Sequence, residues 1–202
     1  CVLMRAGTSR GPFFLRDWLP ADEAARNEVL IGAIGASDLL QVDGVGGGST
    51  LTSKVAIVSR STQPDCQLDY LFAQVGVGRN SVDTRPNCGN MLSGVAPFAI
   101  EQGLVPAQGD STTVRVFNVN TRSRIDVTVC TPGGRVRYDG QTRIDGVAGT
   151  DAAGMVIPRM AAPLASLNGA VVGMIDNAKI GTERLFDFIE EILRKDYGVR
   201  EF

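Results

Sequence analysis

The sequence of 202 residues contains no histidine. This absence excludes Ser-His-Asp triads, Cys-His dyads and the zinc sites that depend on imidazole ligands. Histidine is also the side chain whose ordinary pKa lies closest to neutral pH. Acid–base chemistry in this chain must therefore come from cysteine, lysine, tyrosine or a carboxyl group whose pKa is shifted by its surroundings.

Net charge and long apolar runs are also scarce. The 20 basic and 22 acidic side chains leave a formal charge of −2, so no polybasic surface is available for nucleic acid or an anionic membrane. The longest apolar runs, at residues 29–36 and 170–175, are too short to span a bilayer. We therefore expect neither nucleic acid nor a membrane among the partners.

The four cysteines are scattered and form no CxxC pair. Such spacing favours reduced thiols and a cytoplasmic protein over a disulfide framework. The chain begins at Cys1 and not at a methionine, which indicates a trimmed or partial sequence. Its hydrophobic content of 44% is that of a folded chain, which excludes intrinsic disorder.

Apolar periodicity predicts an α+β chain in two parts, residues 1–152 and 153–202. In the first part we expect a β-rich sheet around one apolar helix at residues 89–103. Because proline lacks an amide hydrogen, we expect a kink or a locally rescued turn at Pro97. Strands are predicted at residues 1–4, 12–15, 55–59, 68–77, 112–118, 124–129 and 136–138, and another helix at residues 20–34. The second part is predicted as a linker at residues 155–163 followed by one βα unit, with a strand at residues 170–175 and a helix at residues 182–195.

A glycine-rich stretch at residues 44–48 leads into Ser53 and Lys54. Glycine-rich backbone can bind phosphate, but a P-loop requires Gly-Lys-Ser/Thr before a helix, whereas here Ser53 precedes Lys54 and a strand follows. Two interpretations remain open. The stretch is either a flexible turn with an exposed lysine, or it directs Lys54 into a pocket where burial lowers its pKa and lets it act as a base.

A second motif, residues 86–90, places Cys88 directly before the predicted apolar helix. Free amides at a helix N-terminus favour anions and lower the pKa of a nearby thiol, so a thiolate there could exchange protons with a carbon acid. The same amides could bind a substrate carboxylate. Alternatively, Cys88 is a small buried residue and Asn90 an ordinary N-cap.

A third motif, residues 5–11, surrounds a turn with two arginines and two hydroxyl groups. Guanidinium and hydroxyl donors suit a dicarboxylate or tricarboxylate substrate. A solvated hairpin loop explains the same residues equally well.

Together and in this order, the three motifs resemble the PrpF-like isomerases, a family that includes 2-methylaconitate cis-trans isomerase and 4-oxalomesaconate tautomerase. The matching stretches are residues 4–14, 52–58, 71–75, 87–91 and 97–101. The tautomerase branch is the more similar one, chiefly in residues 69–74. The resemblance covers about residues 1–150.

This resemblance implies one lobe of a diaminopimelate-epimerase-like fold, in which a β-barrel-like sheet surrounds a central helix and the active site lies between two lobes. It implies Lys54 and Cys88 as the proton-transfer residues, and no cofactor or metal. The implied substrate-binding residues are Thr8, Ser9, Arg10, Ser53, Asn87, Gly89 and Asn90.

The chain also departs from the family. Ala6 and Arg10 stand where the family usually has glycine and lysine, and a planar guanidinium is not equivalent to an ammonium group. No second lobe follows the first. Instead, residues 165–169, 173–179 and 197–199 resemble the opening βα unit of the UGSC family, which suggests a fusion or deletion product.

Two functional hypotheses follow. The first is a cofactor-independent isomerase that catalyses a 1,3-proton shift, by tautomerisation or double-bond migration, on an unsaturated polycarboxylate such as 4-oxalomesaconate. The alternative is a catalytically inactive single lobe that binds carboxylates or a protein partner. Because an unpartnered lobe exposes apolar surface, we also expect self-association.

Overall fold

The computed structural model describes residues 1–139, 143–145, 147–156, 166, 168–169 and 182–201. Contacts divide the chain into two units, Cys1–Pro158 and Arg159–Phe202. Among the helices of the described residues, none combines the length and apolar character needed to cross a membrane.

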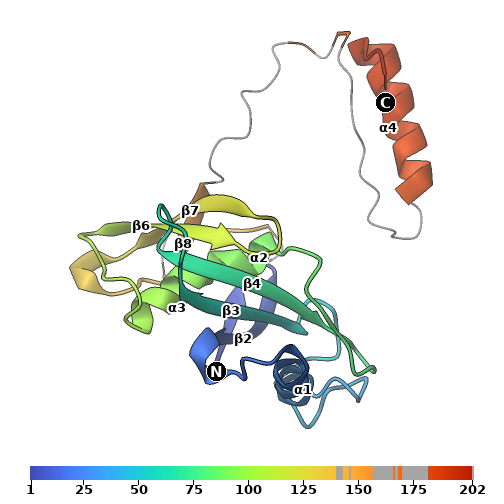
Figure 1. Ribbon diagram of the computed structural model, residues 1–202. Coiled ribbons are helices and arrows are strands. Elements are labelled where there is room, and N and C mark those ends of the chain that lie inside the picture. Colours follow the sequence, from blue (N-terminus) through green and yellow to red (C-terminus); the bar gives the residue numbers. More distant parts are fainter. Residues whose placement is uncertain (140–142, 146, 157–165, 167, 170–181, 202) are drawn as a thin grey trace. The chain divides into compact units, whose positions relative to one another are not determined.

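The first unit is built on one mixed sheet (Figure 1). Its described strands are β1 (Val2–Ala6), β2 (Ser9–Leu15), β3 (Lys54–Arg60), β4 (Leu68–Val75), β5 (Val82–Asp83), β6 (Ser111–Asn118), β7 (Ser123–Cys130) and β8 (Ala153–Val156). The strand order is β1-β2-β3-β4-β6-β7-β8, and β5 pairs with β4. The β2–β3 and β4–β6 pairs are parallel and the other pairs are antiparallel.

Two short helices, α2 (Gly89–Ser93) and α3 (Val95–Glu101), lie inside the curl of this sheet. Their apolar side chains form one buried cluster with residues from β1, β2, β3, β4, β6 and β7. The sequence therefore predicted correctly a sheet around a central apolar helical segment.

The central segment breaks at Gly94, whereas α3 runs through Pro97, so of the kink and the locally rescued turn predicted there the structure favours the second. A Cβ on Gly94 would lie 2.6 Å from the ring of Phe13, so glycine permits the close approach of helix and sheet at this point. Pro97 is the third residue of α3, a position where an amide hydrogen would have no intrahelical acceptor. The absence of that hydrogen in proline therefore costs no hydrogen bond. The proline is therefore accommodated without a kink of its own.

The outer face of the sheet is covered by α1 (Glu23–Ile34), which packs Leu30 and Ile34 into a second buried cluster. Asp22 caps the N-terminus of the helix, because its carboxylate accepts a hydrogen bond from the Ala25 amide at 2.9 Å. β3 contributes alternate residues to the two clusters, so it is buried on both faces and reads as a continuous apolar run. The described residues of this unit also include two 3-10 turns, η1 (Arg16–Trp18) and η2 (Pro132–Gly134).

Three predictions differ from the structure at the end of the first unit and beyond. Residues 136–138 form no strand. Met155 and Val156, expected in a linker, belong to β8 and pair with β7. The expected strand at residues 170–175 lies outside the described residues.

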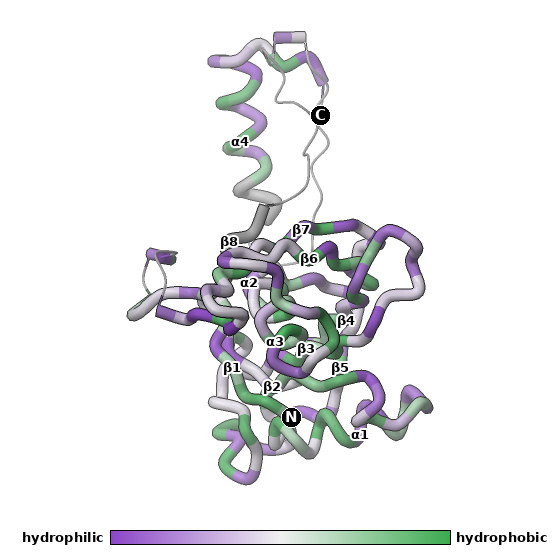
Figure 2. The backbone as a smooth tube through the Cα atoms, turned by 90° about the vertical axis from the view of Figure 1, so that its left-hand side faces the viewer, coloured by the Kyte–Doolittle hydropathy of each residue, from purple (hydrophilic) through white to green (hydrophobic). Residues whose placement is uncertain are grey.

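In the second unit the predicted amphipathic helix is present as α4 (Thr182–Tyr197). Hydrophobic and hydrophilic segments alternate along it, as the tube in Figure 2 shows.

Candidate active site

The turn between β1 and β2 is held against the start of α2. Gly7 has a φ of 55° in this turn, and a Cβ there would overlap the Asn90 side chain. The amide of Thr8 donates to Asn90 Oδ1 at 3.1 Å. Two predicted substrate-binding residues, Thr8 and Asn90, are therefore adjacent, although 82 positions separate them in the chain.

Ser9 and Arg10 follow this turn and differ in what they contact. Ser9 is buried, and its hydroxyl has no hydrogen-bond partner among the described residues. Arg10 Nη2 is 3.3 Å from the carbonyl oxygens of Val45 and Gly46, so this arginine holds the glycine-rich loop. The carboxylate-binding role of both residues stays a prediction.

The glycine-rich loop is organised around Gln41, a buried residue with a φ of 54°. Gln41 Oε1 accepts hydrogen bonds from the Gly48 amide and the Ser53 hydroxyl, both at 2.9 Å. The Ser53 hydroxyl also lies 2.7 Å from the Ser49 carbonyl oxygen. Ser53 is fully buried inside this network, so its hydroxyl serves the loop in this structure, and its role in substrate binding stays a prediction.

Lys54 begins β3 and lies opposite Gln74 in the β3–β4 pairing. Its Nζ donates to Gln74 Oε1 at 3.1 Å and lies 5.2 Å from the centre of the Phe72 ring. Gly11 of β2 lets the backbone of β3 approach closely at Lys54, because a Cβ on residue 11 would overlap the Lys54 carbonyl oxygen. Lys54 is therefore partly buried and not freely exposed, and the interpretation that it enters a pocket and acts as a base stays a prediction.

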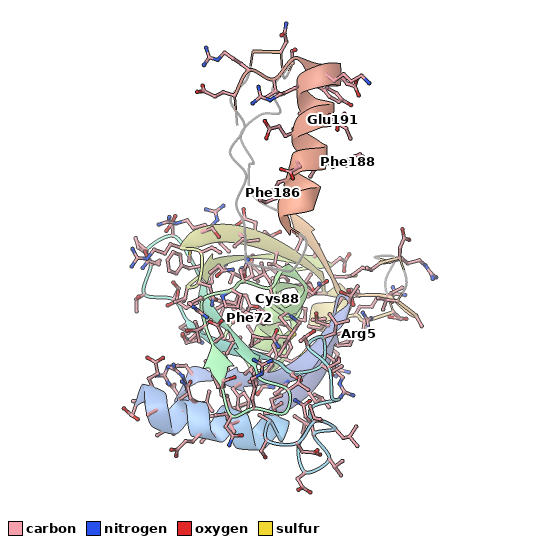
Figure 3. The ribbon with its side chains drawn as sticks, turned by 90° about the vertical axis from the view of Figure 1, so that its right-hand side faces the viewer. Arg5, Phe72, Cys88, Phe186, Phe188 and Glu191 are labelled. Atoms are coloured by element: carbon pink, nitrogen blue, oxygen red, sulfur yellow. The ribbon has the colours of Figure 1, made fainter. Side chains whose placement is uncertain are left out.

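Cys88 is buried at the N-cap position of α2. Its carbonyl oxygen accepts from the Tyr70 hydroxyl at 3.1 Å and from the Leu92 amide at 3.2 Å. Burial, with a smaller contribution from Cys88, raises the pKa of Tyr70 well above its ordinary value, so this phenol acts as a donor. Phe72 and Cys88 both lie in the buried cluster within the sheet (Figure 3).

One face of β4 links the two predicted catalytic residues. Tyr70, Phe72 and Gln74 alternate along the strand, so their side chains lie on the same face. Tyr70 contacts Cys88, whereas Phe72 and Gln74 contact Lys54. Four residues of extended strand span about 13 Å, so both contacts fall within a short stretch of one surface.

The other predicted residues surround the start of α2. Asn87 Oδ1 accepts from the side-chain amide of Asn118 at 2.7 Å, and Asn118 is fully buried at the end of β6. Gly89 is exposed, and a Cβ there would meet no atom within 4 Å. α2 has only five residues, which makes its dipole weaker than that of the long helix expected from the sequence.

Sequence reasoning missed Tyr70, Gln74 and Asn118, which hold the predicted residues in place. Gln74 carried a signal, since it is polar at a position of β4 whose alternation places it with Tyr70 and Phe72. The other two required knowledge of which strands pair.

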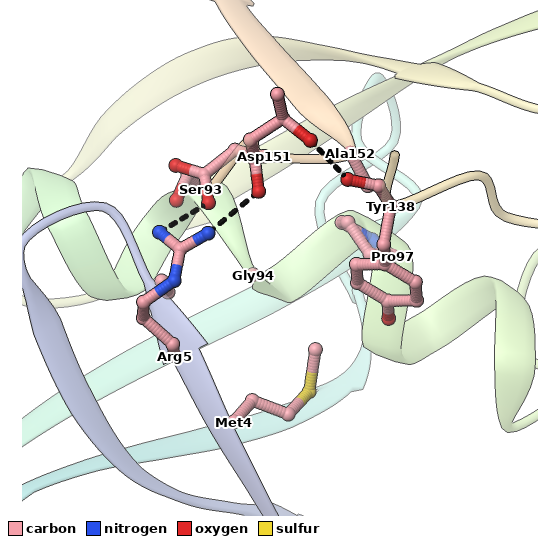
Figure 4. Close-up of a pocket in the computed structure, with 10 residues that line it drawn as sticks. Met4, Arg5, Ser93, Gly94, Pro97, Tyr138, Asp151 and Ala152 are labelled. Carbon is pink, nitrogen blue, oxygen red and sulfur yellow. Dashed lines mark hydrogen bonds and ion pairs between the residues drawn. The ribbon is translucent and has the colours of Figure 1, made fainter. Parts of the chain in front are cut away.

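A separate cavity of about 170 Å³ lies where the two edges of the sheet approach each other (Figure 4). Arg5 of β1 donates to Asp151 Oδ1 at 2.7 Å and to the Thr150 carbonyl oxygen at 2.6 Å, just before β8. The Thr150 hydroxyl donates to the Tyr138 carbonyl oxygen at 2.6 Å. None of the predicted site residues lines this cavity, so it is distinct from the candidate active site.

Comparison with known proteins places the chain in a family. Residues 1–178 match the family model described as PrpF protein. The chain is 56% identical over 152 residues to "Putative isomerase YbhH" of Escherichia coli, covering 75% of this chain and 43% of that protein. It is 54% identical over 152 residues to "(4E)-oxalomesaconate Delta-isomerase" of a Novosphingobium species, with the same two coverages.

The crystal structure of methylitaconate-delta-isomerase aligns with a TM-score of 0.72 and 44% identity, over 75% of this chain and 68% of that one. Its similarity and the curled mixed sheet confirm the predicted α+β, epimerase-like fold. The chain belongs to the PrpF family.

The chain spans about two fifths of the length of the curated relatives that it matches. The family match continues to residue 178, into the segment where the sequence suggested the start of a UGSC-like unit. That second resemblance stays a prediction.

Proposed function

We propose that the chain provides the proton-transfer face of a PrpF-type isomerase that catalyses a 1,3-proton shift on an unsaturated polycarboxylate, with 4-oxalomesaconate as the substrate. The observation that carries the proposal is that one face of β4 holds both Lys54 and the backbone of Cys88. The name of the Novosphingobium relative supports the choice of substrate.

In the proposed reaction, one of the two groups removes a proton from a carbon beside the carbonyl or carboxylate group. The electron pair of the broken C–H bond forms a new double bond to the middle carbon. The π electrons of the original double bond then form the new C–H bond at the far carbon, where the other group delivers a proton. No atom is gained or lost, and no oxidant is required. Lys54 and Cys88 are assigned to these two steps, while Thr8, Asn87, Gly89 and Asn90 are assigned to binding the carboxylates.

The test is to add the purified chain to 4-oxalomesaconate in D₂O and follow ultraviolet absorbance and deuterium uptake together. Deuterium uptake reports proton removal even when completed turnover is slow. We expect uptake at the reacting carbon, with a longer PrpF relative as the positive control. The absence of both signals, with the relative active, would refute the proposal.

The inactive-lobe alternative is favoured by one observation, namely that neither Lys54 nor Cys88 lines the cavity described above. In that case the chain would bind di- or tricarboxylates without exchange. Calorimetric titration with 4-oxalomesaconate separates the two, because binding without deuterium uptake supports the alternative.

We also propose that the first unit self-associates through the loops on either side of the glycine-rich stretch. Leu40 and Val42 are each 73% exposed there, and Leu51 is 52% exposed. A set of exposed large apolar side chains favours association. Sedimentation of the parent and of Leu40→Ser at several concentrations tests this, and a parent that stays monomeric throughout would contradict it.

A further inference from the structure

Gln74 is the residue that restrains the Lys54 side chain. Its Oε1 lies 3.1 Å from Lys54 Nζ, while the Phe72 ring lies beneath the same nitrogen at 5.2 Å. An amide oxygen and the face of an aromatic ring both attract an ammonium group. Together they hold Nζ from two directions.

The orientation of the Gln74 amide is itself fixed. Its Nε2 lies 2.9 Å from the Ser53 carbonyl oxygen. It also lies 3.3 Å from the carbonyl oxygens of Thr50 and Val75. A flipped amide would direct its oxygen at three carbonyl oxygens, none of which can donate a hydrogen bond. The oxygen must therefore face Lys54.

We propose that Gln74 is a positioning residue that holds the Lys54 amine over Phe72 for proton transfer. The contact stands on the structure, whereas its catalytic consequence rests on the proposed function. Glutamine suits this task because it accepts a hydrogen bond from the amine without adding a charge. A glutamate here would pair with the ammonium form and oppose release of its proton.

The chain is favourable for testing this contact directly. Its only lysines are Lys54, Lys179 and Lys195, so Lys54 is the single lysine of the first unit. A peptide that contains modified Lys54 can therefore be identified by mass spectrometry without ambiguity.

The experiment measures the pH dependence of Lys54 acetylation by acetic anhydride in the parent, Gln74→Glu and Gln74→Met. Glutamate adds a charge, and methionine keeps the side-chain length but removes the acceptor. Gln67→Met is the matched control. Gln67 is exposed, and its side chain accepts a hydrogen bond from the Arg115 amide and not from Lys54. The kinetics of 4-oxalomesaconate turnover are measured on the same preparations.

We expect the midpoint of Lys54 acetylation to rise by roughly half a pH unit in Gln74→Glu and to fall in Gln74→Met. In Gln74→Met, kcat is expected to fall about tenfold while KM stays within about threefold, because positioning is lost and binding is not. Gln67→Met should match the parent in both measurements.

Acetylation profiles of both Gln74 variants that superimpose on the parent profile would overturn the proposal. A parent with neither turnover nor deuterium uptake would instead contradict the proposed function and leave the acetylation test intact. If the variants do not fold, NMR of the parent tests whether Gln74 and Phe72 hold the Lys54 amine. We expect the Lys54 ε-protons to be shifted upfield by the Phe72 ring and to show contacts with Gln74, and the absence of both overturns the proposal.

Discussion

Two glutamines bind two consecutive residues at the start of β3, Ser53 and Lys54. One glutamine fixes a residue of the loop, and the other fixes a residue of the candidate site. Gln41 is buried, and its oxygen binds the Ser53 hydroxyl within the loop. Gln74 is only partly buried, and its oxygen binds Lys54 Nζ. Ser53 lies just before β3 and bonds into the loop, whereas Lys54, the first residue of β3, is directed towards the candidate site.

This difference separates polar groups that support the fold from those available for chemistry. The Gln41 side chain bonds to Gly76, Gly48 and Ser53, all of which are groups that support the fold. The Gln74 network ends on an amine that still has donors to offer a ligand. We therefore expect changes around Gln41 to alter stability, and changes around Gln74 to alter activity.

The largest effect is expected from Lys54→Met. Removal of a proton-transfer group typically lowers turnover by about 10²- to 10⁴-fold, whereas loss of one partly buried amine should have little effect on unfolding. Deuterium uptake into 4-oxalomesaconate and urea unfolding measure the two properties. Lys54→Arg is the control that keeps the charge but does not release a proton, and parental uptake in Lys54→Met would contradict the assignment.

Gln41→Ala should lower the free energy of unfolding by about 2–4 kcal/mol, because the Gly48 amide and the Ser53 hydroxyl lose a buried acceptor. Urea unfolding measures this, with exposed Gln67→Ala as the control. A loss below about 1 kcal/mol would show that this network is not a main support of the loop.

Ser53→Ala distinguishes the two roles within one residue. If Ser53 only supports the loop, we expect a loss of about 1 kcal/mol in unfolding free energy and an unchanged KM for the carboxylate substrate. A tenfold rise in KM at parental stability would restore the prediction that Ser53 binds substrate.

The smallest effect is expected at Asp83, which pairs with Gln74 across β4 and β5. Hydrogen bonds from Arg85 lower the pKa of Asp83 to about 2. Because the pKa is lowered in the folded state, this stabilisation is present above the ordinary pKa of aspartate and is lost as pH falls towards 2. The Arg85 side chain is exposed and the Asp83 side chain is partly exposed, so Asp83→Asn should unfold like the parent at pH 7. An NMR titration of the Asp83 carboxyl group that gives a midpoint near 4 would contradict the ion pair.

Much of the fold could be predicted because burial leaves periodic patterns in sequence. The β6–β7 hairpin alternates apolar and polar residues, and α1 begins at an acidic cap and ends at Gly35 with a φ of 75°. The break at Gly94 could not be predicted, because it depends on the ring of Phe13, a residue distant in sequence.

The candidate site was predictable only as a set of residue types. Lysine and cysteine stand out in a chain without histidine, but the partners that position them lie on other strands. The contact between Lys54 and Gln74 exists because β3 and β4 pair in one register, and a shift by one residue would turn Gln74 to the opposite face.

The bridge from Arg5 to the segment just before β8 joins positions 145 residues apart. Native contacts of such long range slow folding, because a large loop must close before they form. At ribosomal speeds the interval between synthesis of Arg5 and of Asp151 is roughly seven to thirty seconds. During that time the Arg5 side chain of β1 has neither of these two partners, so this edge of the sheet closes last.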